Sequence, residues 1–448
     1  MSTDYDCVVA GGGPAGAFAA HELARAGLRV LIVDPASGRP RLEGLGARVE
    51  QLLRARGLDG ALAAASGPLP RSVAWAGLSD NASGERLVER TRFDAALRRA
   101  AVAAGARLET ARVRRVLAAD PGDGVSLLLS SGKAVTARLM VDARGRQAPS
   151  RDRLKGPETL AISGYLRQSA EDNGTFVAAT PEGWLWRAAA PGFKTWVQVC
   201  IDAGDLEGSG QPALEARVAR FLAQPEIRDA FADAVLRRPL QARSAGLVLA
   251  APELRLPVIP VGDAAVAIDP LSGHGLFWAL SSALAAVPAA LTLLEMPGEG
   301  AGLAARFYRD RVVGTFWRQA RTGRDFHRLE TALAAHDFWR RRAAWPDDDP
   351  AHPEADAVSL VRRVVVDGNR LAERDVLVTP LDPGGVAFVA GIPVRDLAAF
   401  LAPGTPRPPP ETVSPQLRTA LGWMASRGLV GETGFPGTHQ HMTTRDTA

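Results

Sequence analysis

The stretch DCVVAGGGPAGAFAAHELARAGLRVLIVDPA, residues 6–36, decides the fold of the first part of the chain. Residues 7–10 form a short apolar run that is too brief for a helix and suits a buried strand. Residues 17–26 are mostly small and predict a helix, which Gly27 ends. Residues 29–33 predict a second strand. The order strand, glycine-rich turn, helix, strand is typical of a βαβ unit that binds a dinucleotide.

Each glycine of the GxGxxG spacing in this turn has its own physical role. Gly11 allows the tight turn, Gly13 lets the backbone approach a pyrophosphate, and Gly16 lets the helix pack against the strand. The helix start offers free N–H groups and a positive dipole end to phosphate. Asp34 stands 18 residues beyond Gly16, where a carboxylate accepts hydrogen bonds from ribose hydroxyls. The residues expected to bind the cofactor here are Gly11, Gly13, Pro14, Ala15, Gly16 and Asp34.

A second segment, LPVIPVGDAAVAIDPLSGHGLFWALSSA (residues 256–283), predicts a strand, a loop and a helix. Gly262 and Asp263 close the strand, and the loop is rich in proline and glycine. The run 275–295 carries no charge before its last residue, so its length alone permits a membrane span. Its many small residues and Pro288 favour a helix buried inside a large domain instead. We therefore expect no membrane span.

These segments resemble the para-hydroxybenzoate hydroxylase superfamily of FAD-dependent enzymes. Residues 87–108, LVERTRFDAALRRAAVAAGARL, are similar to its R-x-x-F-D-x-x-L segment, and residues 139–151, LMVDARGRQAPSR, to its D-A-x-G-R stretch. The resemblance extends over about residues 4–330. It implies FAD as the cofactor and an α/β fold. A Rossmann-type FAD-binding domain is then interleaved with an antiparallel-sheet substrate domain, and a small C-terminal extra domain follows.

The resemblance also implies roles for individual residues. Asp263 would bind the ribityl chain, and the following loop would lie beside the isoalloxazine, whose reduced form is stabilised by backbone N–H groups. Arg90 would contact phosphate or flavin, and the backbone of Val113 would lie near the adenine. His274 would act as an acid or base, or would simply be a loop histidine bonded to backbone. This second group of cofactor-binding residues comprises Arg90, Val113, Asp263, Pro270, Gly273, Gly275 and Leu276.

The segments also predict domain boundaries. Residues 1–158 form the first part of the FAD-binding domain and residues 251–344 the second part, with the helices that follow it. Residues 159–250 form the substrate domain, where apolar runs broken by turns predict an antiparallel sheet. Residues 345–448 form a small C-terminal domain.

The C-terminal region opens with a charged, proline-broken linker, WPDDDPAHPEAD. We expect a helix over 356–372, a short strand over 386–390, a proline-rich stretch over 402–410 and a final helix over 414–427. A winged-helix fold is the predicted arrangement. Two roles are open for this region: a lid on the FAD domain, or a module that docks a protein.

Three chemistries compete within the superfamily. Monooxygenases hydroxylate an electron-rich aromatic ring through a flavin C4a-hydroperoxide. Halogenases use the same intermediate and a lysine that carries the halogen. Saturases of the geranylgeranyl reductase kind deliver hydride to alkenes. A fold does not decide among these reactions, so the residues of the site must.

Residues 183–192, GWLWRAAAPG, resemble the W-x-W-x-I-P motif of the halogenases through Trp184 and Trp186. They depart from it where Ile-Pro should follow. The halogenase lysine lies well before this motif, in the N-terminal part of the chain, whereas the first lysine here is Lys133 in a turn. This disfavours halogenation. The two tryptophans are expected either to pack against the flavin domain or to form an aromatic wall for the substrate.

The group that fits best comprises flavoproteins that modify a tryptophan side chain within a protein, in biogenesis of tryptophylquinone cofactors. It implies a single-component FAD-dependent monooxygenase that uses NAD(P)H and O2. The substrate would be an aromatic ring, including a protein or peptide tryptophan docked near the C-terminal domain. No second GxGxxG follows a strand, so NAD(P)H would be a transient reductant. A flavin-binding partner without turnover is the remaining alternative.

Composition excludes several other classes of protein. The net charge of +4 gives no nucleic-acid footprint. Three residues are lysines and the other 50 basic residues are arginines, so a mechanism that needs a lysine has three candidates. Cys7 and Cys200 stand alone, which favours neither a disulfide framework nor a metal site. The thiols and the lack of a signal peptide predict a cytoplasmic protein.

Overall fold

A computed structural model describes residues 3–120, 122–150, 152–168, 173–401 and 413–429. The chain divides into two compact units. The first contains Met1–Ala301 and Tyr308–Ala351, and the second contains Gly302–Phe307 and His352–Ala448. The larger unit holds all of the residues expected to bind a cofactor.

The opening βαβ unit forms as predicted. Strand β1 (Tyr5–Ala10) leads through the glycine turn into helix α1 (Pro14–Arg25), and strand β2 (Val30–Val33) returns parallel to β1. Proline suits the first turn of a helix because its missing N–H would have no helical partner there. Gly27 has a φ of +87°, which lets the chain leave the helix and enter β2.

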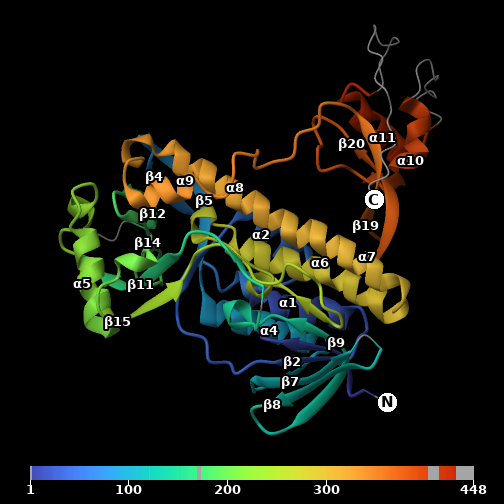
Figure 1. The fold of residues 1–448 in the computed structure, drawn as a ribbon, viewed down its shortest axis with the longest axis horizontal. Helices are drawn as coiled ribbons and strands as arrows, with labels where there is room; N and C mark the ends of the chain where they lie inside the picture. The colour runs from blue at the N-terminus through green and yellow to red at the C-terminus, as the bar shows by residue number, and fades with distance from the viewer. Residues whose placement is uncertain (1–2, 121, 151, 169–172, 402–412, 430–448) are drawn as a thin grey trace. The chain divides into compact units, whose positions relative to one another are not determined.

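The first sheet surrounds this unit. Its strand order is β6-β2-β1-β9-β8-β7, and β17 pairs in parallel with β9. Its remaining strands are β6 (Arg107–Glu109), β7 (Val113–Asp120), β8 (Gly124–Leu129), β9 (Ala134–Asp142) and β17 (Val258–Pro260). The central strands are parallel, and β2 and the last four residues of β1 are buried, as is typical of helix-covered strands. Helix α1 packs against α4 (Arg90–Ala103) and α6 (Gly275–Glu295) (Figure 1).

The second sheet is largely antiparallel and has the order β15-β11-β14-β13-β12-β4-β5-β3. Its strands are β3 (Leu42–Leu45), β4 (Leu69–Trp75), β5 (Leu78–Glu89), β11 (Thr159–Arg167), β12 (Gly174–Thr180), β13 (Gly183–Ala189), β14 (Trp196–Asp202) and β15 (Val235–Ser244). Helix α5 (Gly210–Leu222) buries Val218 and Phe221 against it. Three strands come from before residue 159, so the sheet also draws on the segment predicted as FAD-binding domain.

Shorter elements complete the larger unit. A three-stranded sheet joins β10 (Leu154–Lys155), β16 (Val248–Leu249) and β18 (Val266–Ala267). The remaining helices of the region are α2 (Ala47–Ala55), α3 (Asp59–Leu62), α7 (Glu299–Tyr308), α8 (Gly314–Leu329) and α9 (Asp337–Ala343). Helices α8 and α9 lie against each other beyond α6 (Figure 1).

Helix α6 is the apolar run of 275–295. Within the described part of the chain, it is the one helix long and apolar enough to cross a membrane by length and composition. Its most apolar window is 78% buried inside the protein, as is typical of a core helix. Pro288 lies inside the helix, and the Thr292 hydroxyl donates to the Pro288 carbonyl at 2.7 Å.

The second unit differs from the expectation at its start. Residues 359–378 form a hairpin of β19 (Ser359–Asp367) and β20 (Arg370–Val378), so the predicted helix over 356–372 is wrong. A small hairpin of β21 (Phe388–Val389) and β22 (Ile392–Pro393), helix α10 (Val394–Leu397) and helix α11 (Pro415–Ala425) follow, so the predicted last helix is confirmed. The winged-helix arrangement stays a prediction, and the proline-rich stretch 402–410 lies outside the described residues.

Candidate functional site

The opening turn shows why each glycine stands where it does. A Cβ at Gly11 would lie 2.3 Å from the Ala143 carbonyl oxygen, and the φ of Gly11 is +105°. A Cβ at Gly16 would lie 1.9 Å from the Gly11 carbonyl oxygen. A Cβ at Gly13 would meet one described atom within 4 Å, Nη2 of Arg90 at 3.9 Å. Protein packing therefore requires Gly11 and Gly16, whereas Gly13 borders open space at the start of α1.

Asp34 stands at the end of β2, as expected, and is tied to this turn. Its Oδ2 accepts a hydrogen bond from the Gly12 amide at 2.7 Å, and its Oδ1 accepts one from the Ala36 amide at 2.8 Å. Each carboxylate oxygen keeps a second lone pair for another donor. Arg98, which the sequence did not indicate, donates to the Gly12 carbonyl at 2.9 Å and lies 3.8 Å from Asp34.

Arg90 joins the two ends of the predicted cofactor site. Its Nη1 lies 2.6 Å from Oε2 of Glu43, and its Nε and Nη2 each lie 2.9 Å from a carboxylate oxygen of Asp94. Nη2 of Arg90 borders Gly13, and a Cβ at Gly275 would lie 3.7 Å from Oε1 of Glu43. The opening turn and the late glycine loop therefore meet across one buried ion pair.

The net charge around this ion pair is positive. Burial alone would raise the pKa of Glu43, but Arg90, Arg41 and Arg243 overcome it and lower that pKa to about 2. The charge of Arg90 and then burial lower the pKa of Arg41 to about 10. Among the described residues, the buried Nε of Arg41 has no hydrogen-bond partner. Guanidinium groups that repel one another, one of them unsatisfied, form a site for a bound anion.

Asp263 lies in the short helix Gly262–Ala264 that follows β17. Burial is the main cause that raises its pKa, although 43% of its side chain is accessible. Nε of Arg146 lies 3.6 Å from Asp263, and Arg146 also donates to the carbonyls of Gly246 and Ile268 at 2.8 and 3.2 Å. Arg146 therefore connects the substrate sheet to the late glycine loop.

The late glycine loop, residues 269–275, is shaped by its own hydrogen bonds. Oδ1 of Asp269 accepts a hydrogen bond from the Leu271 amide at 2.9 Å, and the short helix that Pro270 begins ends at Gly273, whose φ is +63°. His274 is the N-cap residue of α6, and both it and Gly273 are exposed. The free N–H groups at the start of this 21-residue helix therefore lie beside the late glycine loop.

The remaining predicted residues occupy different surroundings. Leu276 is 3% exposed in the first turn of α6, and Val113 begins β7 next to Arg112, which donates to Ser37 at 3.1 Å. His274 has a pKa lowered by burial and by Arg48. Trp184 and Trp186 do not line the cavity described next. Trp184 is 3% exposed in a hydrophobic cluster, and Trp186 is half-buried beside it.

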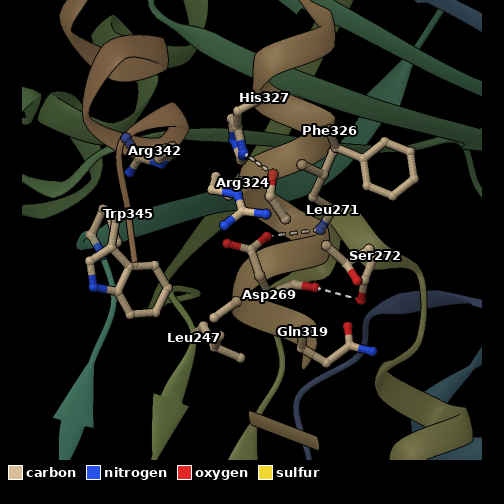
Figure 2. Close-up of a pocket in the computed structure, with 14 residues that line it drawn as sticks. Leu247, Asp269, Leu271, Ser272, Gln319, Arg324, Phe326, His327, Arg342 and Trp345 are labelled. Carbon is tan, nitrogen blue, oxygen red and sulfur yellow. Dashed lines mark hydrogen bonds between the residues drawn. The ribbon is translucent and has the colours of Figure 1, made fainter. Parts of the chain in front are cut away.

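A cavity lies on the α8 side of the late glycine loop (Figure 2). It encloses about 530 Å³ of space between protein atoms, part of it open to solvent. Its lining comes from the loop, from α8 and from the chain around α9. The residues of these walls include Leu247, Asp269, Leu271, Phe326, His327, Arg342 and Trp345.

His327 is a buried histidine of this wall that the sequence analysis missed. It is 5% exposed, and its Nδ1 lies 2.6 Å from the Gly323 carbonyl, so Nδ1 carries the proton. Its Nε2 is buried and has no hydrogen-bond partner among the described residues. Burial, and secondly the charge of Arg342, lower the pKa of His327 to about 4. A lone histidine on an amphipathic helix gives no sequence signal of this kind.

The buried neutral His327 makes stability sensitive to acid. Because its folded pKa lies below the unfolded value, the unfolded chain takes up a proton first. The stabilisation is complete above about pH 6.5 and is lost as the pH falls toward the folded pKa. Between about pH 7 and pH 5 we expect the free energy of unfolding to fall by about 2 kcal/mol through His327, and His327→Gln should not show this fall. Urea unfolding of both proteins at both pH values measures it, and equal losses would contradict it.

The fold is that of the FAD-dependent flavoenzymes of the para-hydroxybenzoate hydroxylase superfamily, and comparison with known proteins agrees. The model of the lycopene cyclase protein family, whose members are FAD-dependent, matches residues 6–162. The chain is 30% identical over 328 residues to the menaquinone reductase of Mycobacterium tuberculosis (strain CDC 1551 / Oshkosh). That alignment covers 63% of this chain and 76% of the reductase.

Solved structures agree as well. The peptidyl tryptophan dihydroxylase QhpG, essential for tryptophylquinone cofactor biogenesis, is 37% identical, with a TM-score of 0.79 over 95% of this chain and 100% of that one. The flavin-dependent halogenase CmlS is 19% identical, with a TM-score of 0.73 over 98% and 99%. The myxobacterial chondrochloren halogenase CndH is 24% identical, with a TM-score of 0.61 over 75% and 85%. The chain belongs to the family of FAD-dependent oxidoreductases that includes QhpG and the menaquinone reductase.

Proposed function

We propose that FAD binds in an extended pose between the opening turn and the late glycine loop. Gly13 and the start of α1 would face the diphosphate, with Arg90 and Arg41 neutralising it. Asp34 would bind the ribose, Val113 would border the adenine, and Asp263 would bind the ribityl chain. The other residues of the site would be Gly11, Pro14, Ala15, Gly16, Pro270, Gly273, Gly275 and Leu276. The unsatisfied Nε of Arg41 and the space beside Gly13 support this assignment.

We propose further that this chain is a monooxygenase that hydroxylates the ring of a tryptophan side chain in a protein. FAD, reduced by NAD(P)H, would supply the activated oxygen. The observation that carries this proposal is the 37% identity to QhpG over 95% of this chain and all of that one. An alignment of that length takes in most of the second unit. A module that docks a protein substrate is therefore a reasonable role for this unit.

The residues of the chain would orient the substrate and keep water out. The N–H groups at the start of α6 would stabilise negative charge on the reduced ring. His274 has a lowered pKa. It would accept or pass on a proton beside the late glycine loop. Trp184 and Trp186 would either pack against the flavin domain or form an aromatic wall for the substrate. The two cysteines are free and buried, which fits the reducing cytoplasm.

Halogenation lacks its halogen carrier in this chain. The three lysines lie elsewhere: Lys133 is 3.7 Å from Glu109, Lys155 is 3.5 Å from Glu158, and Lys194 lies over the ring of Tyr165. The described lining of the cavity contains no lysine. We therefore expect chloride or bromide to leave the product unchanged.

Mass spectrometry tests the proposed hydroxylation. Purified holoenzyme with NAD(P)H, O2 and a tryptophan-containing candidate peptide is expected to add oxygen atoms to the tryptophan. The same reaction under ¹⁸O2 should place the heavy isotope in the product, because the oxygen comes from O2 and not from water. The peptide with phenylalanine in place of tryptophan is the control. Oxidation of NAD(P)H without any labelled product, for every peptide tried, would contradict the proposal.

The menaquinone reductase similarity favours a second candidate function. The 30% identity over 328 residues to a menaquinone reductase is compatible with the saturase alternative, in which hydride is delivered to an alkene. That reaction adds two hydrogen atoms and proceeds without O2. Incubation with menaquinone and NAD(P)H under nitrogen, followed by reoxidation of the quinone ring in air, distinguishes the candidates. Two hydrogens retained on the side chain after reoxidation would favour the saturase, and their absence would favour the monooxygenase.

A further inference from the structure

The cavity beside the late glycine loop has mostly apolar walls and one carboxylate. Leu271 of the loop, Leu247, Phe326 of α8 and Trp345 after α9 supply large apolar surfaces. Asp269 lies at the loop end of the same cavity (Figure 2). Large apolar walls with a carboxylate at one end suit an aromatic ring that carries a single polar edge.

The carboxylate of Asp269 has one oxygen that is not used by the protein. Its Oδ1 accepts the Leu271 amide, which shapes the loop. The described residues offer no hydrogen bond to Oδ2, which Figure 2 shows directed into the space that the labelled side chains enclose. A charged acceptor left without a donor in apolar surroundings is costly, so a donor from water or from a ligand is required.

The neighbouring arginine does not supply that donor. Arg342 is 5% exposed and gives its N–H groups to the Phe338 carbonyl, the Glu158 carbonyl and the Thr159 hydroxyl, at 3.0, 3.1 and 2.9 Å. Its charge still favours the ionised form of Asp269 at longer range. Burial raises the pKa of Asp269, and the Leu271 amide and Arg342 oppose that rise. Ser272, Gln319 and Arg324 also line the cavity, but none of the described residues donates a hydrogen bond to Oδ2 of Asp269, so a ligand can donate to it.

We propose that this cavity binds the ring that is oxidised, and that Oδ2 of Asp269 accepts a hydrogen bond from an N–H of that ring. The inference rests on the proposed function and assigns the residue that recognises the N–H of the indole ring. It also makes Asp269 a catalytic residue. When a ring carbon donates its electrons to oxygen, positive charge develops on the ring nitrogen, and a carboxylate at that N–H stabilises the charge.

Binding of indole and of 1-methylindole to the FAD-bound enzyme tests this hydrogen bond. The two rings have the same walls to contact, but 1-methylindole has no N–H. Each is titrated while the visible absorbance of the flavin is followed. We expect indole to bind about 10- to 100-fold more tightly, which is the effect of one hydrogen bond to a charged group. Equal affinities, or no binding of either ring, would overturn the inference.

Asp269→Asn is the matched variant. Its carbonyl oxygen can still accept the Leu271 amide and hold the loop, while its NH2 group replaces the accepting Oδ2 with a donor. Indole and 1-methylindole should then bind alike, with FAD retained. Asp229→Asn is the control, because Asp229 is 96% exposed and neither it nor its partner Arg228 lines the cavity. A tenfold preference for indole that survives in Asp269→Asn would contradict the assignment of the acceptor.

The turnover assay separates this inference from the proposed function. Peptides that contain tryptophan or 1-methyltryptophan are compared for oxygen incorporation. If both peptides are hydroxylated equally well, the monooxygenase proposal stands and the Asp269 contact fails. If indole is preferred in the binding assay but no peptide gains oxygen, the contact stands and the proposed function fails.

Discussion

Gly13→Ala is expected to leave the fold intact and to weaken FAD binding about 10- to 100-fold, the usual consequence of one misplaced methyl group in a packed contact. Gly13 has a φ of −69°, which alanine adopts without strain. The added Cβ would clash with no described atom of the protein, since the nearest is Nη2 of Arg90 at 3.9 Å. The methyl group would instead occupy the space into which a diphosphate must fit.

Two other glycine variants define what this result means. Gly60→Ala adds a methyl group in open space on α3 and should change neither stability nor FAD affinity. Gly16→Ala should destabilise the protein itself, because its Cβ would lie 1.9 Å from the Gly11 carbonyl oxygen. Titration of apoprotein with FAD and thermal unfolding give the two readouts. Unchanged FAD affinity in Gly13→Ala would refute a cofactor diphosphate at this turn.

The parts of the site that the sequence predicted are those whose chemistry is local. The roles of Gly11 and Gly16 follow from spacing within one turn. The pairing of Arg90 with Glu43 could not be predicted in this way. The two residues are 47 positions apart and meet because β3 pairs with β5, where the register sets Glu43 opposite Val88. Register between distant strands depends on tertiary packing rather than on local pattern.

The error in the C-terminal region had a different cause. Residues 359–367, SLVRRVVVD, contain four valines, and Gly368 and Asn369 form a two-residue turn into the next strand. A β-branched run that ends in such a turn predicts a hairpin. The helix predicted there gave too little weight to these two signals. His327 and the free oxygen of Asp269, by contrast, leave no trace in the sequence, because burial and unmet hydrogen bonds exist only in the folded chain.

Arg90→Met is expected to cost about 3 kcal/mol of stability and to prevent FAD binding. The substitution removes a guanidinium that is 11% exposed and leaves the Glu43 and Asp94 carboxylates, 27% and 16% exposed, without it. Breaking a buried pair by removing one partner costs about 3–5 kcal/mol. Arg41 and Arg243 remain near Glu43, so we expect the lower end of this range.

A double-mutant cycle with Asp94→Asn identifies the source of that cost. If an uncompensated carboxylate causes the loss, Arg90→Met with Asp94→Asn should recover about 1 kcal/mol or more relative to the sum of the single changes. Unfolding by urea in the absence of FAD keeps the cofactor out of the comparison. Strict additivity would mean that Arg90 acts through packing of its aliphatic stem. FAD binding should stay lost in the double variant, because the guanidinium that borders Gly13 is absent from it.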